Sequence, residues 1–250
     1  MERFSLTIAP GGENHHGMEL IGKGPDETQG FSYEDLVKLD NHFGKQGYVC
    51  EFVDLNDYID EEVEKACVLI VRKYVNESKK IFEEVSNDEW DKKYFCTRRK
   101  KVLNKRARYN LCYVEGKSQE PDYENGKGTI IDLVTKKELY NNYKRVTKDI
   151  NEVIKFEPYV VEGNYYYNNK TGIGFHGDTE RNIVVAFSIG CKTTIKWRWY
   201  HKNQQIGIEC PIELNDGDMY IMSEKAVGTD WKKSSKYTLR HAAGSEKYIK

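Results

Sequence analysis

The sequence lacks any apolar run of the roughly 18 to 20 residues needed to cross a bilayer. Its first residues also lack the basic and then apolar pattern of a secretory signal. None of the six cysteines forms a Cys-x-x-Cys pair, which argues against a zinc knuckle or a redox dithiol and favours reduced, mostly buried thiols. These absences predict a soluble, intracellular protein of the cytoplasm or nucleus, without a membrane span.

An excess of one charge is also lacking. The formal net charge is -1, although charged residues make up 32% of the chain. Any attraction to nucleic acid must therefore come from a local patch. Residues 92–108 form such a patch, because they contain no acidic side chain and nine basic ones, Lys92, Lys93, Arg98, Arg99, Lys100, Lys101, Lys105, Arg106 and Arg108. A solvated basic loop or a nuclear-import tract is the structural alternative.

No internal repeat or low-complexity linker divides the 250 residues, so one large domain or a core with an N-terminal extension is expected. Ser32 is placed to cap a short helix that runs to about His42 and ends at Gly44 or Gly47. Another amphipathic stretch spans residues 136–154. Helical spacing from about residue 60 predicts a further helix, which carries Val63, Cys67, Ile70, Val71 and Tyr74.

The character of the chain becomes β-rich from about Phe156. Turn signals at Pro121-Asp122 and Asn125-Gly126 predict loops and hairpins over residues 109–128. Short strands are then predicted near residues 159–161, 183–189, 193–200 and 219–222. Several short strands at this spacing predict an α+β protein with a β-sandwich or jelly-roll core.

One short motif carries metal chemistry. His176 and Asp178 lie two residues apart before a β-prone run, so on an extended strand their side chains point to the same face. His241, 65 residues later, can return beside them on another strand. Two imidazoles and one carboxylate form a facial triad that leaves three iron(II) positions open for a bidentate co-substrate and O2. His201 is the competing ligand, and a surface turn is the structural alternative for His-x-Asp.

The surrounding residues give this motif a family resemblance. Asn164-x-Tyr166, nine residues, and then His176-x-Asp178, with Glu180 after the aspartate, resembles the AlkB-like branch of the Fe(II)/2-oxoglutarate-dependent dioxygenases. Residues 215–223, Asn-Asp-Gly-Asp-Met-Tyr-Ile-Met-Ser, followed by Trp231, resemble that family's turn, strand and tryptophan ahead of the second histidine. The resemblance covers about residues 104–250. It implies a double-stranded β-helix domain there, preceded by a helical and mixed extension over residues 1–103.

The resemblance also implies the chemistry. His176, Asp178 and His241 would hold Fe(II), and 2-oxoglutarate would serve as co-substrate with O2. Asn164 and Tyr166 would hydrogen-bond the co-substrate, although a tyrosine-rich β surface is their structural alternative. The implied reaction hydroxylates or oxidatively demethylates a nucleobase, and hydroxylation of an N-methyl group would release formaldehyde.

The sequence departs from the family in two places. Residues 232–240 separate Trp231 from His241, whereas AlkB-like proteins have that histidine close after the tryptophan. The family's arginines beyond the second histidine, one of which binds the distal carboxylate of 2-oxoglutarate, are also missing from the nine residues after His241. Because an unpaired buried carboxylate costs several kcal/mol, another cation is expected. The candidates are Lys250, then Lys247 and Arg198.

The sequence is compatible with more than one class of substrate. Residues 107–111 resemble the nucleotide-recognition lid of AlkB, so the predicted nucleic-acid contacts are Arg98, Arg99, Lys100, Lys101, Arg108 and Tyr109. Tyr113 and Tyr123 are further candidates for stacking on an extruded base. The alternative is a protein hydroxylase of the prolyl type or a small-molecule hydroxylase, which a lysine anchor favours. A silent binding module is a third alternative, against which the complete triad argues.

A glycine-rich motif near the N-terminus has no assigned chemistry. Residues 12–18, Gly-Glu-Asn-His-His-Gly-Met, together with residues 30–36 are similar to a motif of viral and protist relatives of these oxygenases. A structural turn is the simpler interpretation.

Overall fold

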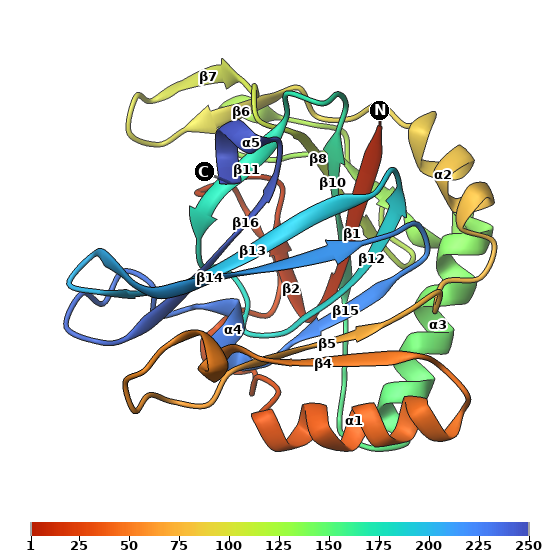
Figure 1. The fold of residues 1–250 in the computed structure, drawn as a ribbon. Coiled ribbons are helices and arrows are strands. Elements are labelled where there is room, and N and C mark those ends of the chain that lie inside the picture. Colours follow the sequence, from red (N-terminus) through yellow and green to blue (C-terminus); the bar gives the residue numbers. More distant parts are fainter. Residues whose placement is uncertain (1, 250) are drawn as a thin grey trace.

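The largest element of the computed structural model, which describes residues 2–249, is an eight-stranded sheet (Figure 1). Its neighbours are antiparallel except for the parallel pair β8 and β9. Across the sheet the strands are β4 (Cys50–Asp54), β5 (Cys67–Val71), β15 (Met219–Met222), β12 (Val184–Gly190), β1 (Arg3–Ala9), β10 (Val160–Tyr166), β8 (Tyr109–Val114) and β9 (Ile130–Asp132).

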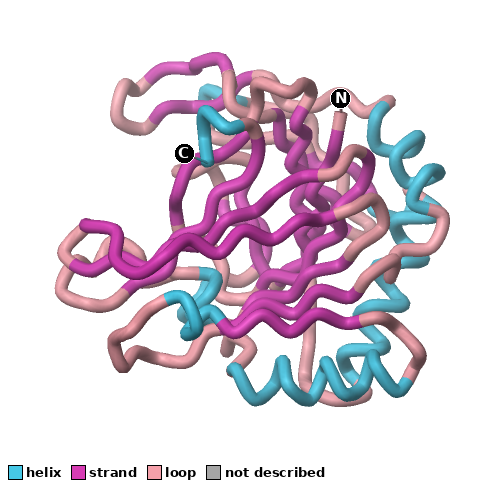
Figure 2. Tube along the Cα trace, in the orientation of Figure 1, coloured by secondary structure: helices cyan, strands magenta, loops and turns pink. Residues whose placement is uncertain are grey.

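A second, four-stranded sheet packs on one face of the large sheet, and the two sheets are visible as crossing layers in Figure 2. Its strands are, in order, β11 (Gly172–His176), β16 (Thr238–Gly244), β13 (Thr193–His201) and β14 (Gln204–Leu214). Two small hairpins complete the strands, β2 (Gly11–Glu13) with β3 (Leu20–Gly22) and β6 (Lys93–Cys96) with β7 (Lys101–Asn104).

Three longer helices cover the other face of the large sheet, where their apolar residues join one core with the sheet. They are α1 (Tyr33–Lys45), α2 (Ser78–Ser86) and α3 (Lys137–Asn151). Two one-turn helices are α4 (Glu224–Val227) and α5 (Glu246–Ile249), and short 3-10 turns span Pro25–Glu27, Leu55–Tyr58, Tyr123–Asn125 and Leu133–Thr135. The protein is therefore an α+β protein that consists mostly of sheet.

Two of the predicted helices are confirmed. At the start of α1, the Ser32 hydroxyl accepts a hydrogen bond from the Asp35 amide, and the Asp35 carboxylate accepts one from the Ser32 amide, both at 3.1 Å. This capping box satisfies two amides that a helix leaves free. The stretch 136–154 forms α3, whose buried side chains recur three or four residues apart and so face the sheet.

The helix predicted from about residue 60 is wrong. Residues 67–71 form strand β5, and a helix, α2, begins only at Ser78. The continuous apolar run Cys-Val-Leu-Ile-Val matches a strand that is covered on both faces, and such a run also mimics helical spacing. Leu69 and Val71 pack in the core beneath the helices, while Val68 and Ile70 face the four-stranded sheet.

The predicted strands near residues 159–161, 183–189, 193–200 and 219–222 are confirmed as parts of β10, β12, β13 and β15. The region predicted to hold loops and hairpins begins instead with a buried strand, β8. No helix within residues 2–249 has the length and apolar character that a membrane crossing requires.

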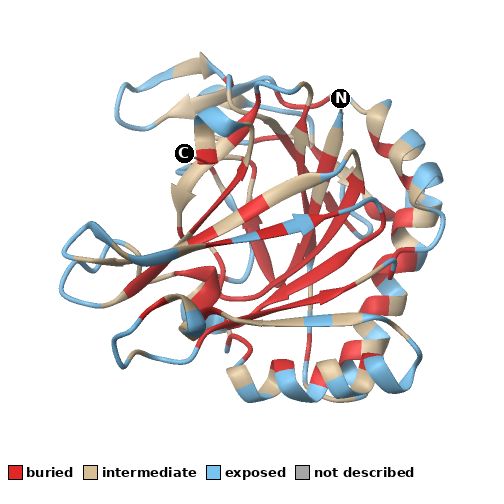
Figure 3. Cartoon of the chain, in the orientation of Figure 1, coloured by how far each residue is buried: buried red, intermediate tan, exposed pale blue. Residues whose placement is uncertain are grey.

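The N-terminal strand β1 occupies the middle of the large sheet, between β10 and β12. Arg3 pairs with Tyr166 on one side and with Gly190 on the other. Phe4, Leu6 and Ile8 belong to the core that the sheet shares with the helices. Figure 3 shows that the strands in the middle of the large sheet are mostly buried. Because β1, β4 and β5 share this sheet with later strands, the predicted division at residues 103/104 runs through the sheet.

Candidate metal centre and its cavity

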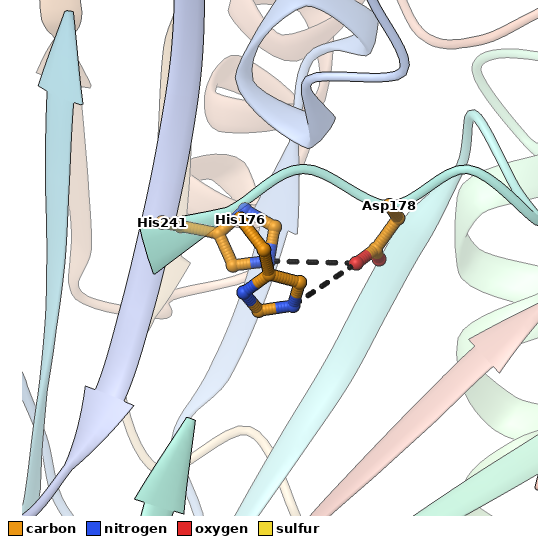
Figure 4. A group of neighbouring side chains, drawn as sticks. All are labelled: His176, Asp178 and His241. Atoms are coloured by element: carbon orange, nitrogen blue, oxygen red, sulfur yellow. Dashed lines mark ion pairs between the residues drawn. The ribbon is translucent and has the colours of Figure 1, made fainter. Parts of the chain in front are cut away.

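The three predicted metal ligands lie together, on the side of the large sheet that faces the four-stranded sheet. The Nε2 atoms of His176 and His241 lie 3.5 and 3.6 Å from the same oxygen, Oδ1 of Asp178 (Figure 4). One ligand atom from each residue lies within 4.8 Å of the other two. The triad predicted from spacing is therefore assembled in space.

Neighbouring strands bring the two histidines together. His176 at the end of β11 pairs directly with His241 in β16. The His176 Nδ1–H donates a hydrogen bond to the Gly174 carbonyl at 2.8 Å, which fixes the tautomer and leaves Nε2 with its lone pair toward Asp178. This matches the prediction that a later strand returns beside the first.

Asp178 reaches the site in a different way from the one predicted. Strand β11 ends at His176, so Asp178 lies in the following loop and not on the strand itself. Its amide donates to the Val227 carbonyl at 3.1 Å, which holds the loop in place. A Cβ atom at the intervening Gly177 would lie 2.0 Å from the Gly228 carbonyl oxygen, so the close approach of the two chains requires glycine.

The protonation states of the ligand side chains favour metal binding. Burial, together with the nearby His241, lowers the pKa of His176 to about 3. Burial alone would raise the pKa of Asp178, but the hydrogen bond and charge of His241, with Arg181 and His176, hold that pKa well below its usual value. At neutral pH the site therefore offers a neutral imidazole and a carboxylate, the forms that bind a metal.

The triad lines a cavity of about 440 Å³ between the sheets. Side chains from strands of the large sheet line part of it, and they include Arg3, Ser5, Glu162, Tyr166, Ser188 and Tyr220. Charged and titratable side chains from outside that sheet line another part, and they include Glu13, His15, Arg108, Glu180 and Arg181.

Arg3 is a site residue that the sequence interpretation missed. Its guanidinium lies over the Tyr166 ring, 4.7 Å from the centroid, and faces the cavity. Within the described part of the chain, its Nε and Nη2 atoms are buried and have no hydrogen-bond partner. A buried cation with unused donors is unfavourable unless an anion binds to it. The alternation Arg-Phe-Ser-Leu-Thr-Ile was the available signal, because it indicates a strand with a polar face.

Two of the three residues predicted to bind the distal carboxylate lie away from the cavity. Lys247 is exposed, does not line the cavity and lies over the Tyr248 ring. Arg198 is ion-paired with Glu209, stacks on Phe175 and does not line the cavity either. Both predictions are therefore wrong, and Lys250 lies outside the described residues.

The predicted co-substrate residues Asn164 and Tyr166 both line the cavity from β10. The Asn164 side-chain oxygen accepts hydrogen bonds from Arg108 Nε and from Asn110 Nδ2, the latter at 2.7 Å. Its amide nitrogen donates to Glu162 Oε1 at 3.1 Å. Asn164 therefore orders the cavity wall, and Tyr166 lies beside the unpaired guanidinium of Arg3.

The predicted substrate residues fall into two sets. Arg108 lines the cavity. The exposed residues Arg98, Arg99, Lys100 and Lys101 lie at the turn of hairpin β6–β7, which projects beyond the sheets in Figure 1. Tyr109 stacks on Tyr167, with ring centroids 4.2 Å apart, and does not line the cavity.

Two of the tyrosines considered for base stacking hold the fold instead. Tyr113 is fully buried and donates a hydrogen bond to Asp88, so the prediction that it stacks on a base is wrong. Tyr123 donates to Asp91 at 2.7 Å and does not line the cavity.

The glycine-rich motif forms a strap over the cavity, defined here as residues 12–17. Glu13, His15 and His16 of the strap all line the cavity. The His15 ring stacks on Tyr94 of hairpin β6–β7, with centroids 3.7 Å apart. The strap is therefore part of the site, where the sequence had indicated only a turn, and it joins the basic hairpin to the cavity.

The competing ligand His201 lies apart from the triad. It ends β13 and stacks on Tyr237 at 4.5 Å. It neither lines the cavity nor belongs to the triad group, so the choice of His241 over His201 agrees with the geometry.

Comparison with known proteins adds one relative. No family model matches the chain. A protein of Acanthamoeba polyphaga mimivirus, named "Uncharacterized protein R156", is 41% identical over 257 aligned positions, which cover 100% of this chain and 98% of that protein. At this identity and coverage, the chain belongs to the same protein family as the mimivirus protein.

Proposed function

We propose that this protein is an Fe(II)/2-oxoglutarate-dependent dioxygenase of the AlkB-like branch, with a double-stranded β-helix core. One observation carries the proposal: a complete His-Asp-His triad and a half-buried arginine, two of whose nitrogen atoms are buried without partners, line the same cavity. The first is the ligand set of a non-haem iron centre. The second is the partner that a co-substrate carboxylate needs.

The strand arrangement supports the β-helix. From β10 to β16 the chain passes back and forth between the sheets, except at the hairpin β13–β14, with three strands in the large sheet and four in the small one. A double-stranded β-helix has four strands in each sheet, so it requires a fourth strand in the large sheet between β10 and β12. Strand β1 occupies that position. The arginine that AlkB-like enzymes carry after the second histidine is then supplied by Arg3, from the opposite end of the chain.

Each part of the cavity has a role in this proposal. Iron(II), with 2-oxoglutarate and O2, would supply the oxidant for C–H hydroxylation. His176, Asp178 and His241 would hold the metal, and Arg3 would pair with the distal carboxylate of 2-oxoglutarate. The Tyr166 ring beneath Arg3 orients the guanidinium, and the apolar walls from Ile195, Leu214 and Ala243 limit water.

A nucleobase is the substrate that the surroundings of the cavity favour. The exposed basic turn of β6–β7 is linked to the strap through the stack of Tyr94 on His15, so a bound phosphate backbone would lie beside the cavity mouth. The protein-hydroxylase alternative was favoured by a lysine anchor at Lys250 or Lys247; Lys247 does not line the cavity, and Arg3 offers an arginine in its place. We therefore favour hydroxylation or oxidative demethylation of a base that is single-stranded or extruded.

The test combines co-substrate turnover with product detection. Purified protein with Fe(II), 2-oxoglutarate and methylated oligonucleotides is expected to form succinate and formaldehyde, and unmethylated oligonucleotides serve as the control. Succinate without formaldehyde, together with hydroxylation of a protein or small molecule, would replace the nucleobase proposal. Absence of both metal binding and 2-oxoglutarate binding would refute the oxygenase itself.

A further inference from the structure

The cavity contains more carboxylates than the triad uses. Glu13, Glu162 and Glu180 line it in addition to Asp178. Glu180 is only two residues from Asp178 in the chain. A facial triad works because three metal positions stay open, so an additional carboxylate ligand would block the co-substrate. Yet neither Glu162 nor Glu180 belongs to the group of ligand atoms that lie within 4.8 Å of one another.

Arg181 holds both of these glutamates. Its guanidinium, on a residue that is 3% exposed, donates to Glu180 Oε1 from Nε at 3.1 Å and from Nη2 at 2.7 Å. Nη2 also forms a short ion pair with Glu162 Oε2. One planar group therefore binds a buried and a half-buried carboxylate at once, a geometry that lysine cannot reproduce.

The same guanidinium also contacts the metal ligand. Arg181 Nε lies 3.7 Å from Asp178 Oδ2, whereas Oδ1 is the oxygen that faces both histidines. The two oxygens of Asp178 are thereby given different partners. This arrangement leaves one oxygen for the metal and opposes bidentate binding, which would fill a further position.

The strap accommodates this group at Gly12. A Cβ atom there would lie 3.2 Å from Glu162 Oε2 and 3.6 Å from Arg181 Nη2. The first glycine of the strap motif therefore leaves the space that the ion pair occupies. This gives a physical role to a residue whose motif had no assigned chemistry.

We propose that Arg181 is a positioning residue that keeps the open face of the metal free of protein carboxylates. The inference rests on the proposed oxygenase function. Without the guanidinium, Glu162 and Glu180 would lose the cation that binds them both, and one of them would turn toward the metal. Metal binding would persist, while the positions needed by water and 2-oxoglutarate would be lost.

The test uses Mn(II) alone and then Mn(II) with 2-oxoglutarate. Water-proton relaxation reports the exchangeable waters on Mn(II), and calorimetry gives the affinity for 2-oxoglutarate. Arg181→Met is expected to retain Mn(II), lower the relaxation enhancement and weaken 2-oxoglutarate binding by roughly tenfold to 100-fold, the range found for partners of metal ligands. Adding Glu180→Gln or Glu162→Gln to Arg181→Met should restore both readouts, and the variant that does so identifies the intruding carboxylate.

The matched control is Arg72→Met. Arg72 also pairs with a buried carboxylate, that of Asp218, which is 1% exposed, and neither residue lines the cavity, so its removal breaks a buried ion pair without a metal effect. If Arg181→Met does not fold, Arg181→Lys carries the same test, because it keeps the charge and loses the two-sided contact.

Three results separate the possibilities. Wild-type protein that binds no Mn(II) would refute the proposed function itself. Wild-type binding with unchanged relaxation and 2-oxoglutarate affinity in the folded Arg181 variant would overturn the inference alone. Loss of both readouts that neither glutamine substitution restores would also overturn it, since a merely structural role of Arg181 predicts that outcome.

Discussion

Replacement of Arg3 by methionine should have opposite effects on the empty protein and on its co-substrate complex. In the empty protein, Nε and Nη2 of Arg3 are buried without partners, and methionine removes them while it keeps an unbranched apolar stem. A buried polar group without a hydrogen bond costs about 1 to 3 kcal/mol. Methionine also loses the cation–π contact with the Tyr166 ring, which costs about 0.5 to 1 kcal/mol and offsets part of this gain in stability.

The net expectation is an empty Arg3→Met protein that is more stable by about 1 kcal/mol. For a chain of this length, that change raises the melting temperature by about 2 to 4 °C. The co-substrate complex should respond in the other direction. Breaking one side of a buried ion pair costs about 3 to 5 kcal/mol, and so 2-oxoglutarate affinity should fall by about 100-fold to a few thousand-fold.

Differential scanning calorimetry of the metal-free protein and calorimetric titration of 2-oxoglutarate into the Mn(II) form would measure the two effects. Arg198→Met and Lys247→Ala are the controls, because neither residue lines the cavity. An Arg3→Met protein that is less stable when empty, or that binds 2-oxoglutarate as tightly as wild type while Lys247→Ala binds weakly, would refute the reasoning.

Three further predictions concern the metal, protons and nucleic acid. Alanine at His176, Asp178 or His241 should abolish succinate formation and lower metal affinity. His201→Ala is the control and should change neither. If His201→Ala lost the metal and His241→Ala retained it, the proposed ligand set would be wrong. Burial lowers the pKa of His15 to about 4 and that of His176 to about 3, below the usual 6.5, so the unfolded chain binds protons that the folded state does not. The contribution of these two histidines to the stability of the metal-free protein should therefore be complete above pH 6.5 and fall as the pH decreases toward 4. Thermal melts over that range should show a shallower slope for His15→Gln, and an unchanged slope would contradict the assignment for His15. Finally, we expect an effect on nucleic-acid binding when alanine replaces the four exposed basic residues of the β6–β7 turn, Arg98, Arg99, Lys100 and Lys101. The salt dependence of oligonucleotide binding should become shallower by very roughly one unit of slope per lost phosphate contact. Uncoupled 2-oxoglutarate turnover should persist in that variant, and a wild-type protein that binds no oligonucleotide at low salt would exclude the nucleic-acid substrate.

The sequence predicted the parts of the site that depend on local spacing. His176 and Asp178 are two residues apart, and this spacing indicated that they lie together, although Asp178 reaches the site from the loop after β11 and not from the strand. The return of His241 had to be inferred. The α1 cap was similarly local, because Ser32 and Asp35 bond each other. These features are encoded within a few residues and need no knowledge of the remaining fold.

The sequence did not reveal contacts that the sheet order creates. Arg3 meets Tyr166 because β1 is inserted beside β10, and no spacing rule connects two residues so far apart in the chain. Residues 67–71 were assigned to a helix because a continuous apolar run satisfies both periodicities. The function of the strap was hidden for the same reason, since Gly12 acquires its role only when Glu162 and Arg181 lie against it.

The place of β1 in the large sheet also has a consequence for the order in which the protein folds. Residues 3–9 are synthesised well before both strands that flank them in the sheet, β10 and β12. Until then β1 has no partners, and afterwards β10 and β12 present facing edges that only this segment completes. Pairings of such long sequence separation form slowly. We therefore expect the last step of folding to be the capture of the first strand, which delivers Arg3 to the cavity in the same event that closes the sheet.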